Sequence, residues 1–255
     1  EEKPVPSYTY GFAAGPFREL PEGRGRVRLR YLAAQFTDDE LRRIFRDTAD
    51  MIGFFEERAG VPYADETYTQ VLAERGYGQE MSGFTVMGEG YGRSVLANEK
   101  DIGLGAHELA HQWWGNMVTC ATWSHFWLNE GMATFMTAAY KERRFGREEY
   151  LREIEASRKD YERVRDAGKD KSLVFPDWSN PTAEDRTLVY DKGAYVIHLL
   201  RDEMGERAFW SGLRQYTRAY FGKSVTTADF KKTMERASGK NLSAFFDKWV
   251  YLKKQ

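Results

Sequence analysis

His107-Glu108-Leu109-Ala110-His111-Gln112-Trp113-Trp114-Gly115 is the stretch that decides the fold of this chain. It holds two histidines four residues apart, with a glutamate directly after the first. Because a helix turns about 100° per residue, both imidazoles leave one face of one helix and can share a metal ion. Glu108 then lies about a quarter-turn away, beside the metal rather than on it. The pattern predicts two zinc ligands, His107 and His111, and a general base, Glu108.

A third protein ligand is expected, because catalytic zinc is usually held by three side chains and keeps one position for water. The segment Trp127-Leu128-Asn129-Glu130-Gly131 offers a carboxylate. The 18 residues between His111 and Glu130 are enough to end one helix, turn and begin another beside it. We therefore predict one zinc ion, bound by His107, His111 and Glu130. The alternative, two ordinary helix histidines and an exposed glutamate, is disfavoured because both segments occur at this spacing.

These residues resemble the gluzincin zinc aminopeptidases, the family of alanyl aminopeptidase and leukotriene hydrolase. Thermolysin-like endopeptidases share the two-histidine helix but are less similar, since their third ligand follows one residue later in a different local pattern. The resemblance implies an α/β, thermolysin-like domain with zinc between a sheet-containing N-terminal half and a helical C-terminal half. It covers nearly the whole chain, and beyond residues 107–119 and Asn129-Glu130-Gly131 it includes Tyr8-Thr9-Tyr10-Gly11-Phe12, Tyr190-Asp191-Lys192-Gly193-Ala194 and Phe245-Phe246-Asp247-Lys248-Trp249.

The resemblance also implies two further site residues. Tyr190 is the family's candidate for stabilising the oxyanion, since a phenol can donate a hydrogen bond to the developing charge. The family holds the substrate's α-amino group partly with a Gly-x-Met-Glu-Asn segment, and residues 77–83 lie at the corresponding place. Glu80 falls on the family's glutamate, whereas Gln79 and Met81 replace its methionine and asparagine. Backbone contacts can survive this change, but it leaves exopeptidase specificity open.

Composition limits the function classes. The 255 residues are 42% hydrophobic and 30% charged, which is typical of a globular protein of one large or two small domains. A net charge of −1 does not indicate nucleic-acid binding. No apolar run approaches the roughly 18 residues of a membrane span. The single cysteine, Cys120, excludes an intrachain disulfide framework and is expected to be packed rather than to bind metal.

Hydrophobic patterns divide the chain into an α/β half, 1–104, and a mainly helical half, 105–255, which we take as one catalytic domain. Thr37 and Glu40 form a predicted capping box at the start of a helix. The expected strands are 7–14, 26–33, 67–73 and 83–87, and 88–92 is expected to be a loop. The expected helices are 37–58, 105–114, one that carries Glu130 and ends near 146, 147–166, 187–204, 206–220, 227–237 and 242–250.

The sequence thus predicts a zinc aminopeptidase that removes N-terminal residues from peptides with metal-activated water and Glu108 as base. Two alternatives remain open: an endopeptidase on the same machinery, and a catalytically weak zinc-bearing scaffold. The second arises because family members usually carry a β-rich domain before this one and a helical domain after it. Since the chain starts at Glu1 rather than at a methionine, we expect it to be part of a longer protein. Side-chain specificity and localisation cannot be read from the residues.

Residues near the motifs are expected to be structural. His125 and His198 lie in apolar helical contexts and are predicted to be packed rather than to bind metal. Four tryptophans flank the zinc segments, and aromatic packing is favoured over substrate stacking for them: Trp113, Trp114, Trp123 and Trp127.

Overall fold

The computed structural model describes residues 4–23, 25–176 and 178–253. Its strands are β1 (Arg18–Glu22), β2 (Arg28–Ala33), β3 (Thr67–Ala73), β4 (Phe84–Gly88), β5 (Val118–Cys120) and β6 (Lys223–Val225). Its helices are α1 (Asp38–Ile44), α2 (Thr48–Ala59), α3 (Glu89–Ala97), α4 (Gly103–Ala110), α5 (Trp127–Phe145), α6 (Arg147–Asp166), α7 (Ala183–Thr187), α8 (Gly193–Met204), α9 (Glu206–Tyr220), α10 (Thr227–Ser238) and α11 (Ser243–Trp249). Short 3-10 helices, η1 (Ser7–Thr9) and η2 (Trp123–His125), and a π-helical turn, η3 (Leu188–Lys192), complete the list.

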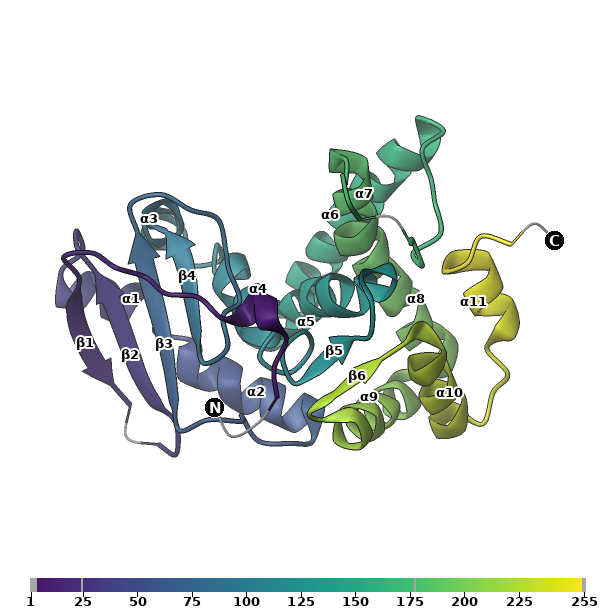
Figure 1. The fold of residues 1–255 in the computed structure, drawn as a ribbon, viewed down its shortest axis with the longest axis horizontal. Helices are drawn as coiled ribbons and strands as arrows, with labels where there is room; N and C mark the ends of the chain where they lie inside the picture. Colours follow the sequence, from purple (N-terminus) through teal and green to yellow (C-terminus); the bar gives the residue numbers. More distant parts are fainter. Residues whose placement is uncertain (1–3, 24, 177, 254–255) are drawn as a thin grey trace.

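A four-stranded mixed sheet forms one end of the molecule, with the order β1-β2-β3-β4 (Figure 1). Strand β1 is antiparallel to β2, while β2, β3 and β4 run parallel. After β3 the chain passes back along the outer edge of β4, where Gln79 bridges Val86 in the antiparallel sense. Residues 79–83, called the edge segment below, then turn into β4. The edge segment therefore borders β4, the strand of this sheet that lies nearest to α4 in Figure 1.

Helices fill the rest of the molecule: α4 lies beside the sheet, α5 and α8 follow it, and α10 and α11 lie towards the end opposite the sheet (Figure 1). One large cluster of buried apolar residues extends from Leu20 in β1 to Val250 after α11, and a small second cluster consists of Tyr161, Val164 and Leu188. Three of the four flanking tryptophans belong to this core, and each indole N–H donates to a residue distant in sequence: Trp113 to the Val61 carbonyl at 3.1 Å, Trp114 to Thr217 Oγ1 at 3.0 Å and Trp127 to Thr227 Oγ1 at 2.9 Å. Packing is confirmed for these three, whereas Trp123 is 47% exposed.

The mixed α/β half followed by a helical half confirms the predicted fold class, and most predicted helices occur close to their expected bounds. The capping box is also confirmed, since Glu40 Oε2 accepts the Thr37 N–H at 2.8 Å and Thr37 Oγ1 accepts the Glu40 N–H at 3.3 Å. The predicted helix 37–58 is wrong as one element, because a turn at 45–47 divides it. The break lets Phe45 enter the core and lets Asp47 accept from Arg144 of α5 at 3.0 Å.

Two other local predictions are wrong. Residues 7–14 form no strand, because the Pro6 carbonyl accepts both the N–H and the Oγ1 hydroxyl of Thr9, at 3.0 and 2.8 Å, and closes a 3-10 turn. Residues 88–92 are not a loop, because Gly88 is the N-cap of α3. Glu89, Gly92 and Val95 form the buried side of that helix, at a helical spacing that outweighs the glycine content. Within the described residues, none of the helices is long and apolar enough to cross a membrane.

Candidate metal and catalytic centre

Two neighbouring helices bring the three predicted metal ligands together. His107 lies in the last turn of α4, His111 caps its end, and Glu130 lies in the first turn of α5. The Nε2 atoms of His107 and His111 are 3.0 Å apart, and they lie 3.1 and 3.3 Å from Glu130 Oε2. Tetrahedral zinc with bonds of about 2.1 Å would place its ligand atoms about 3.4 Å from one another. This nearly equilateral triangle therefore fits a zinc ion.

The opposite ring nitrogen of each histidine also has a partner. The Nδ1 of His111 lies 3.0 Å from the Trp114 carbonyl. Because a carbonyl oxygen can only accept a hydrogen bond, this nitrogen carries the proton. The Nδ1 of His107 lies 3.5 Å from Thr134 Oγ1 on α5. A proton held on Nδ1 leaves the lone pair on Nε2, which is the atom directed at the Glu130 carboxylate. The Trp114 carbonyl thus selects the tautomer that a metal requires at His111, and the Thr134 hydroxyl can accept the corresponding proton of His107.

The ligand cluster is strongly desolvated and strongly coupled. Glu130 is 3% exposed and His111 is 1% exposed. Burial lowers the pKa of His111, but the charge of Glu130 more than offsets it, so that the pKa rises to about 10. The two histidines hold the pKa of Glu130 well below its usual range despite burial. A cation bound among these groups would displace the shared proton, because imidazole and carboxylate bind metals in their deprotonated forms.

A close crossing of two helices joins Glu130 to Tyr190. A Cβ atom on Gly131 would lie 2.8 Å from the Gly193 Cα, so both helices need glycine there. Gly131 follows Glu130, and Gly193 follows the π-helical turn η3 that carries Tyr190. The Tyr190 ring stacks on the His107 ring, with centroids 5.6 Å apart and an interplanar angle of 10°. Burial, followed by the charge of Glu130, raises the pKa of Tyr190, so its hydroxyl stays protonated and can donate.

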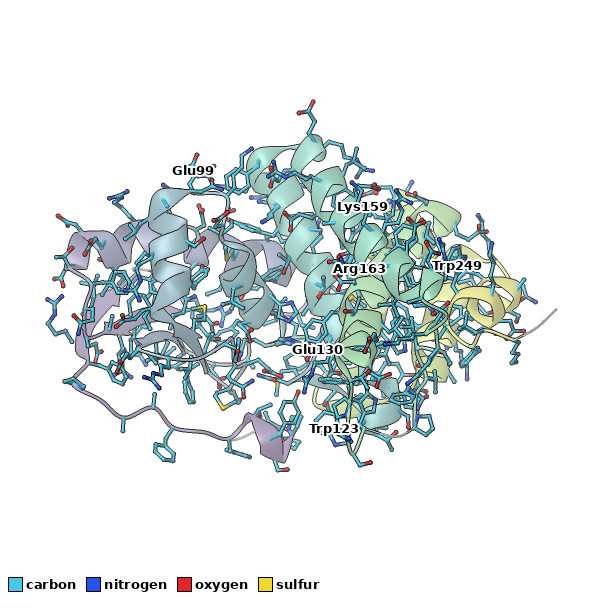
Figure 2. All side chains as sticks on the ribbon, turned by 90° about the horizontal axis from the view of Figure 1, so that it is seen from above. Glu99, Trp123, Glu130, Lys159, Arg163 and Trp249 are labelled. Carbon is cyan, nitrogen blue, oxygen red and sulfur yellow. The ribbon has the colours of Figure 1, made fainter. Side chains whose placement is uncertain are left out.

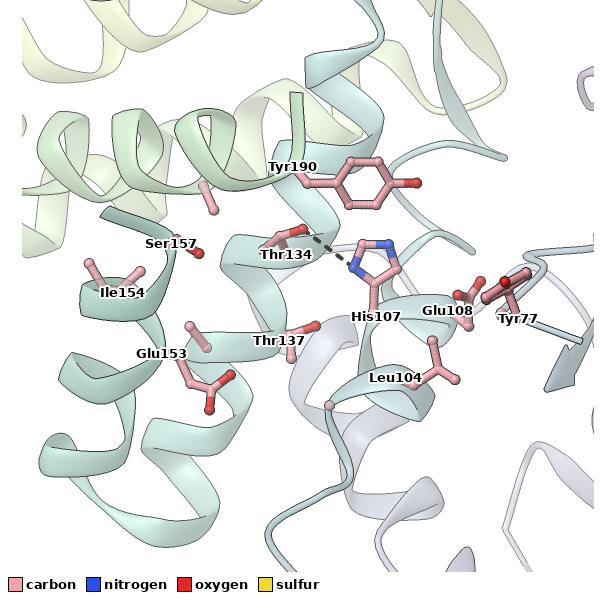
Figure 3. A pocket seen from close by; sticks show the side chains of 14 residues that line it. Tyr77, Leu104, His107, Glu108, Thr134, Thr137, Glu153, Ile154, Ser157 and Tyr190 are labelled. Carbon is pink, nitrogen blue, oxygen red and sulfur yellow. Dashed lines mark hydrogen bonds between the residues drawn. The ribbon is translucent and has the colours of Figure 1, made fainter. Parts of the chain in front are cut away.

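Figure 2 shows Glu130 near the middle of the molecule, between the sheet and the C-terminal helices. Beside the ligands lies a cavity of about 440 Å³, lined partly by His107, Glu108 and Tyr190. Figure 3 shows these three side chains at one end of it, together with Tyr77, and shows the contact between Thr134 and His107. The cavity extends from there between α5 and α6 towards Ile154 and Ser157, so it offers room for a substrate next to the ligand cluster.

Glu108 faces this cavity from α4. A Cβ atom on Gly78 would lie 1.8 Å from Glu108 Oε1, so only glycine at position 78 leaves space for the carboxylate. Burial raises the pKa of Glu108 to about 8, although the charge of His111 acts in the opposite direction. Glu108 Oε2 is buried and has no hydrogen-bond partner among the described residues. A buried carboxylate oxygen without a partner is costly for stability, and it suits a group that exchanges a proton with a bound molecule.

Glu80 is 7% exposed and lies in the edge segment, next to the Gln79–Val86 bridge to β4. Its charge acts on His107, His111 and Tyr190, whose pKa values it raises after the larger effects of burial and Glu130. Glu80 therefore lies close enough for its charge to act on four of the other predicted site residues: His107, His111, Glu108 and Tyr190. Its side chain has the charge that a substrate ammonium group would need.

Residues that the sequence did not single out complete this region. Tyr8 accepts a hydrogen bond from Asn129 Nδ2 at 3.4 Å, and burial, then the charge of Glu80, raises its pKa. Gln112 and Asn116 bind the main chain of the edge segment. Nothing in a single sequence marks Gly78, although the close approach to Glu108 requires it. Gln112 and Asn116 lie within residues 107–119, so their position in a stretch that resembles the family was the sequence signal that could have pointed to them.

The residues expected to be structural lie outside the ligand cluster. His125 Nδ1 is 3.0 Å from Thr227 Oγ1 and His198 Nδ1 is 2.8 Å from the Tyr150 hydroxyl, so both are packed through hydrogen bonds. Burial raises the pKa of the Cys120 thiol to about 12, as expected of a packed side chain. Among the described residues, His107, His111 and Glu130 are the one group of three or more such side chains whose ligand atoms converge within 4.8 Å.

Comparison with known proteins agrees with this geometry. A family model described as the peptidase family M1 domain matches residues 45–249. Aminopeptidase N of Lactococcus lactis subsp. lactis is 34% identical over 162 residues, which cover 57% of this chain and 18% of that protein. Leucine aminopeptidase 2 of Aspergillus fumigatus is 28% identical over 249 residues, which cover 92% of this chain and 38% of that protein. The chain thus spans less than half the length of these curated relatives.

Solved structures share the fold. The M1 zinc metallopeptidase of Deinococcus radiodurans, in a mutant form bound to a Tyr-Ser-Ala substrate, matches 100% of this chain and 56% of its own with a TM-score of 0.77 and 26% identity. Yeast LTA4 hydrolase in complex with bestatin matches 98% of this chain and 41% of its own with a TM-score of 0.83 and 25% identity. With a family model that covers most of its length and this shared fold, the chain belongs to peptidase family M1.

Proposed function

We propose that this chain is the catalytic part of a zinc aminopeptidase, which removes N-terminal residues from peptides. The observation that carries the proposal is the convergence of two imidazoles and a carboxylate at 3.0 to 3.3 Å, with Glu108 and Tyr190 on the same cavity. His107, His111 and Glu130 would hold a single zinc ion. When bound there, zinc supplies a Lewis acid that polarises a carbonyl and acidifies water.

The other residues supply proton transfer and charge stabilisation. Glu108 takes a proton from the attacking water and passes it to the amine that leaves. Its high burial and its partnerless Oε2 support this role, because the proton is exchanged in a site with few competing donors. Tyr190 keeps its proton and donates it in a hydrogen bond to the oxygen that becomes negative. The ring stacking on His107 fixes the direction of that donor.

Exopeptidase specificity requires a partner for the substrate's α-amino group. An ammonium that is buried beside a metal cation is repelled by it and deprived of water, so it binds only with a carboxylate nearby. Glu80 supplies this charge from the edge segment. The named aminopeptidase relatives are consistent with the same substrate class. An endopeptidase remains the second candidate, because Gln79 and Met81 depart from the family's amine-binding pattern.

The test combines metal analysis with two substrates, an aminoacyl-nitroanilide that has a free amine and an N-blocked peptide. We expect about one zinc per chain, cleavage of the free-amine substrate, and little cleavage of the blocked one. Chelation should abolish activity and added zinc should restore it. Cleavage of the blocked peptide at a similar rate would favour the endopeptidase. Zinc binding without cleavage of either substrate would favour the scaffold, and full activity in metal-free protein would contradict the mechanism.

A further inference from the structure

Two buried carboxamide side chains, those of Gln112 and Asn116, connect the chain just after α4 to the edge segment. Gln112 follows the ligand His111 and is 4% exposed, while Asn116 is 2% exposed. Gln112 Nε2 donates to the Met81 carbonyl at 3.0 Å, and its Oε1 accepts the Gly83 N–H at 3.0 Å. Asn116 Nδ2 donates to the Glu80 carbonyl at 3.2 Å. These three contacts therefore bind the main chain of the edge segment at Glu80 and in the three residues that follow it.

All three contacts are made to main-chain atoms. They depend on the path of the backbone at Glu80, Met81 and Gly83 and not on which side chains occupy positions 79 and 81. On its other side the edge segment is fixed by β4, since Gln79 and Val86 exchange two backbone hydrogen bonds of 3.0 and 3.2 Å. The segment can thus depart from the family's amine-binding pattern and still hold Glu80 at a fixed place relative to the metal ligands.

A role in stability alone explains this arrangement poorly. Asn116 Oδ1 is buried and has no hydrogen-bond partner among the described residues. Leaving a buried acceptor unpaired costs free energy, so part of what Asn116 gains by donating to the Glu80 carbonyl is offset by its own Oδ1. The contact that Asn116 does make is to the residue whose carboxylate would bind the substrate amine. This favours a role in positioning over a role in packing.

We propose that Gln112 and Asn116 are positioning residues for substrate recognition, which set the distance between Glu80 and the metal ligands. An exopeptidase needs this distance to match one residue, because the amine and the scissile carbonyl are bound at the same time. Gln112 directly follows His111, and Asn116 lies in the turn after it, where its N–H donates to the His111 carbonyl at 2.9 Å. The metal ligands and the amine-binding carboxylate thus share one support. The inference rests on the proposed aminopeptidase function and adds the residues that set the distance between the amine-binding carboxylate and the metal ligands.

The experiment uses Gln112→Met and Asn116→Leu, which keep side-chain size and remove the hydrogen bonds, each in the natural background and together with Glu80→Gln. All variants are compared as zinc-loaded protein. Since a misplacement of about 1 Å can cost about 100-fold in rate, kcat/KM for an aminoacyl-nitroanilide should fall roughly 10- to 100-fold in each single variant. Zinc content should not change. In the Glu80→Gln background the same substitutions should change kcat/KM by less than about 3-fold, because the group that they position is already lost.

Binding gives a second readout that does not require turnover. Leucine hydroxamate carries a free amine, and N-acetyl-leucine hydroxamate does not. Each substitution should weaken inhibition by the first compound about 10-fold or more, and should leave inhibition by the second nearly unchanged. Gln215→Met is the matched control, because Gln215 is exposed and, within the part of the chain that the structure describes, its side chain donates to the neighbouring Ser211 Oγ at 3.2 Å. It should behave like the unsubstituted protein in every assay.

The outcomes separate this proposal from the proposed function. If the unsubstituted protein does not distinguish free from blocked amines, the aminopeptidase assignment itself fails, and the positioning role falls with it. If the protein does distinguish them but both substitutions lower the two kinds of substrate equally, or lower them as much in the Glu80→Gln background, the positioning role is overturned. Loss of zinc in both variants would also overturn it, because the carboxamides would then be needed to keep the metal ligands of α4 in place. Unchanged selectivity in both variants has the same meaning.

Discussion

The two sides of the site are built in different ways. The helical side consists of α4, α5 and the π-helical turn η3, and its residues are held by packing inside the apolar core. The other side is the edge segment, an irregular stretch on the rim of the sheet that is held by hydrogen bonds to its main chain. On the helical side, glycines allow two backbone segments to approach each other closely, as at Gly131 and Gly193. Carboxamides provide the equivalent support on the edge side.

This difference separates two functions that one site must combine. In the proposed mechanism, the helical side carries the groups that are needed to cleave any peptide bond: the predicted metal ligands, Glu108 and Tyr190. The edge side carries Glu80, the proposed partner of the substrate amine, which would matter only when that amine is free. Damage to the helical side should therefore affect all substrates alike, whereas damage to the edge side should affect their ratio. The predictions below test this separation, beginning with the largest effect.

Glu108→Gln should have the largest effect. The amide keeps the size of the carboxylate but cannot accept the proton of the attacking water, so kcat should fall roughly 100- to 10,000-fold. Because Glu108 is on the helical side, free-amine and blocked substrates should lose activity by the same factor, as measured by kcat/KM for each. Zinc content, measured by atomic absorption, should be retained. A loss confined to free-amine substrates, or a loss of zinc, would contradict the separation of roles.

Tyr190→Phe should have a smaller effect of the same kind. The phenyl ring keeps the stacking on His107, while the hydrogen-bond donor to the oxyanion is lost. We expect kcat to fall roughly 10- to 1000-fold with little change in KM, because the interaction forms mainly in the transition state. Tyr195→Phe, on the adjacent helix α8, is the control and should be nearly neutral. A rise in KM alone would mean that Tyr190 binds the substrate and does not stabilise the oxyanion.

The predicted metal ligands and Glu108 on the helical side could be read from the sequence because their signals are local, whereas Tyr190 came from the family resemblance. The spacing of four between His107 and His111 places both on one helix face, and Glu130 lies in the first turn of the next long helix. The same local logic gave α6 and α9 at their observed bounds. It failed at residues 45–47, where burial of Phe45 and the contact between Asp47 and Arg144 divide the predicted helix. Those contacts join parts of the chain that no local pattern connects.

The edge side could not be predicted in this way. Gln112 and Met81 are 31 residues apart, and Asn116 and Glu80 are 36 apart, so no periodicity relates them. Glu80 came from a family resemblance rather than from its neighbours. The carboxamides were quoted in a motif but had no assigned partner. Tertiary hydrogen bonds fix the edge segment, and they can be recognised only when the positions of the sheet and of α4 are known.

The smallest effect concerns the stability of the helical side. Asp191 follows Tyr190 on the π-helical turn, and its Oδ1 accepts a hydrogen bond from Ser157 Oγ at 3.2 Å. Burial raises the pKa of Asp191 to about 6, and the charge of Asp160 acts in the same direction. In the unfolded chain the carboxyl group titrates near pH 4. Between about pH 4 and 6 the folded state therefore binds more protons, and its stability falls as the pH rises through this window.

Asp191→Asn should remove this pH-dependent cost while an amide oxygen still accepts from Ser157. At pH 7 the variant should be more stable by about 1–3 kcal/mol, since one pKa unit corresponds to about 1.4 kcal/mol. Below about pH 4, where the natural carboxyl group is neutral, the gain should vanish. Thermal unfolding of zinc-loaded protein at several pH values measures both, with the exposed Asp166→Asn as control. A variant that is neutral or destabilised at pH 7 would show that the ionised Asp191 costs the fold nothing. The π-helical turn that carries Tyr190 would then be maintained without a cost in folding free energy from the Asp191 carboxylate.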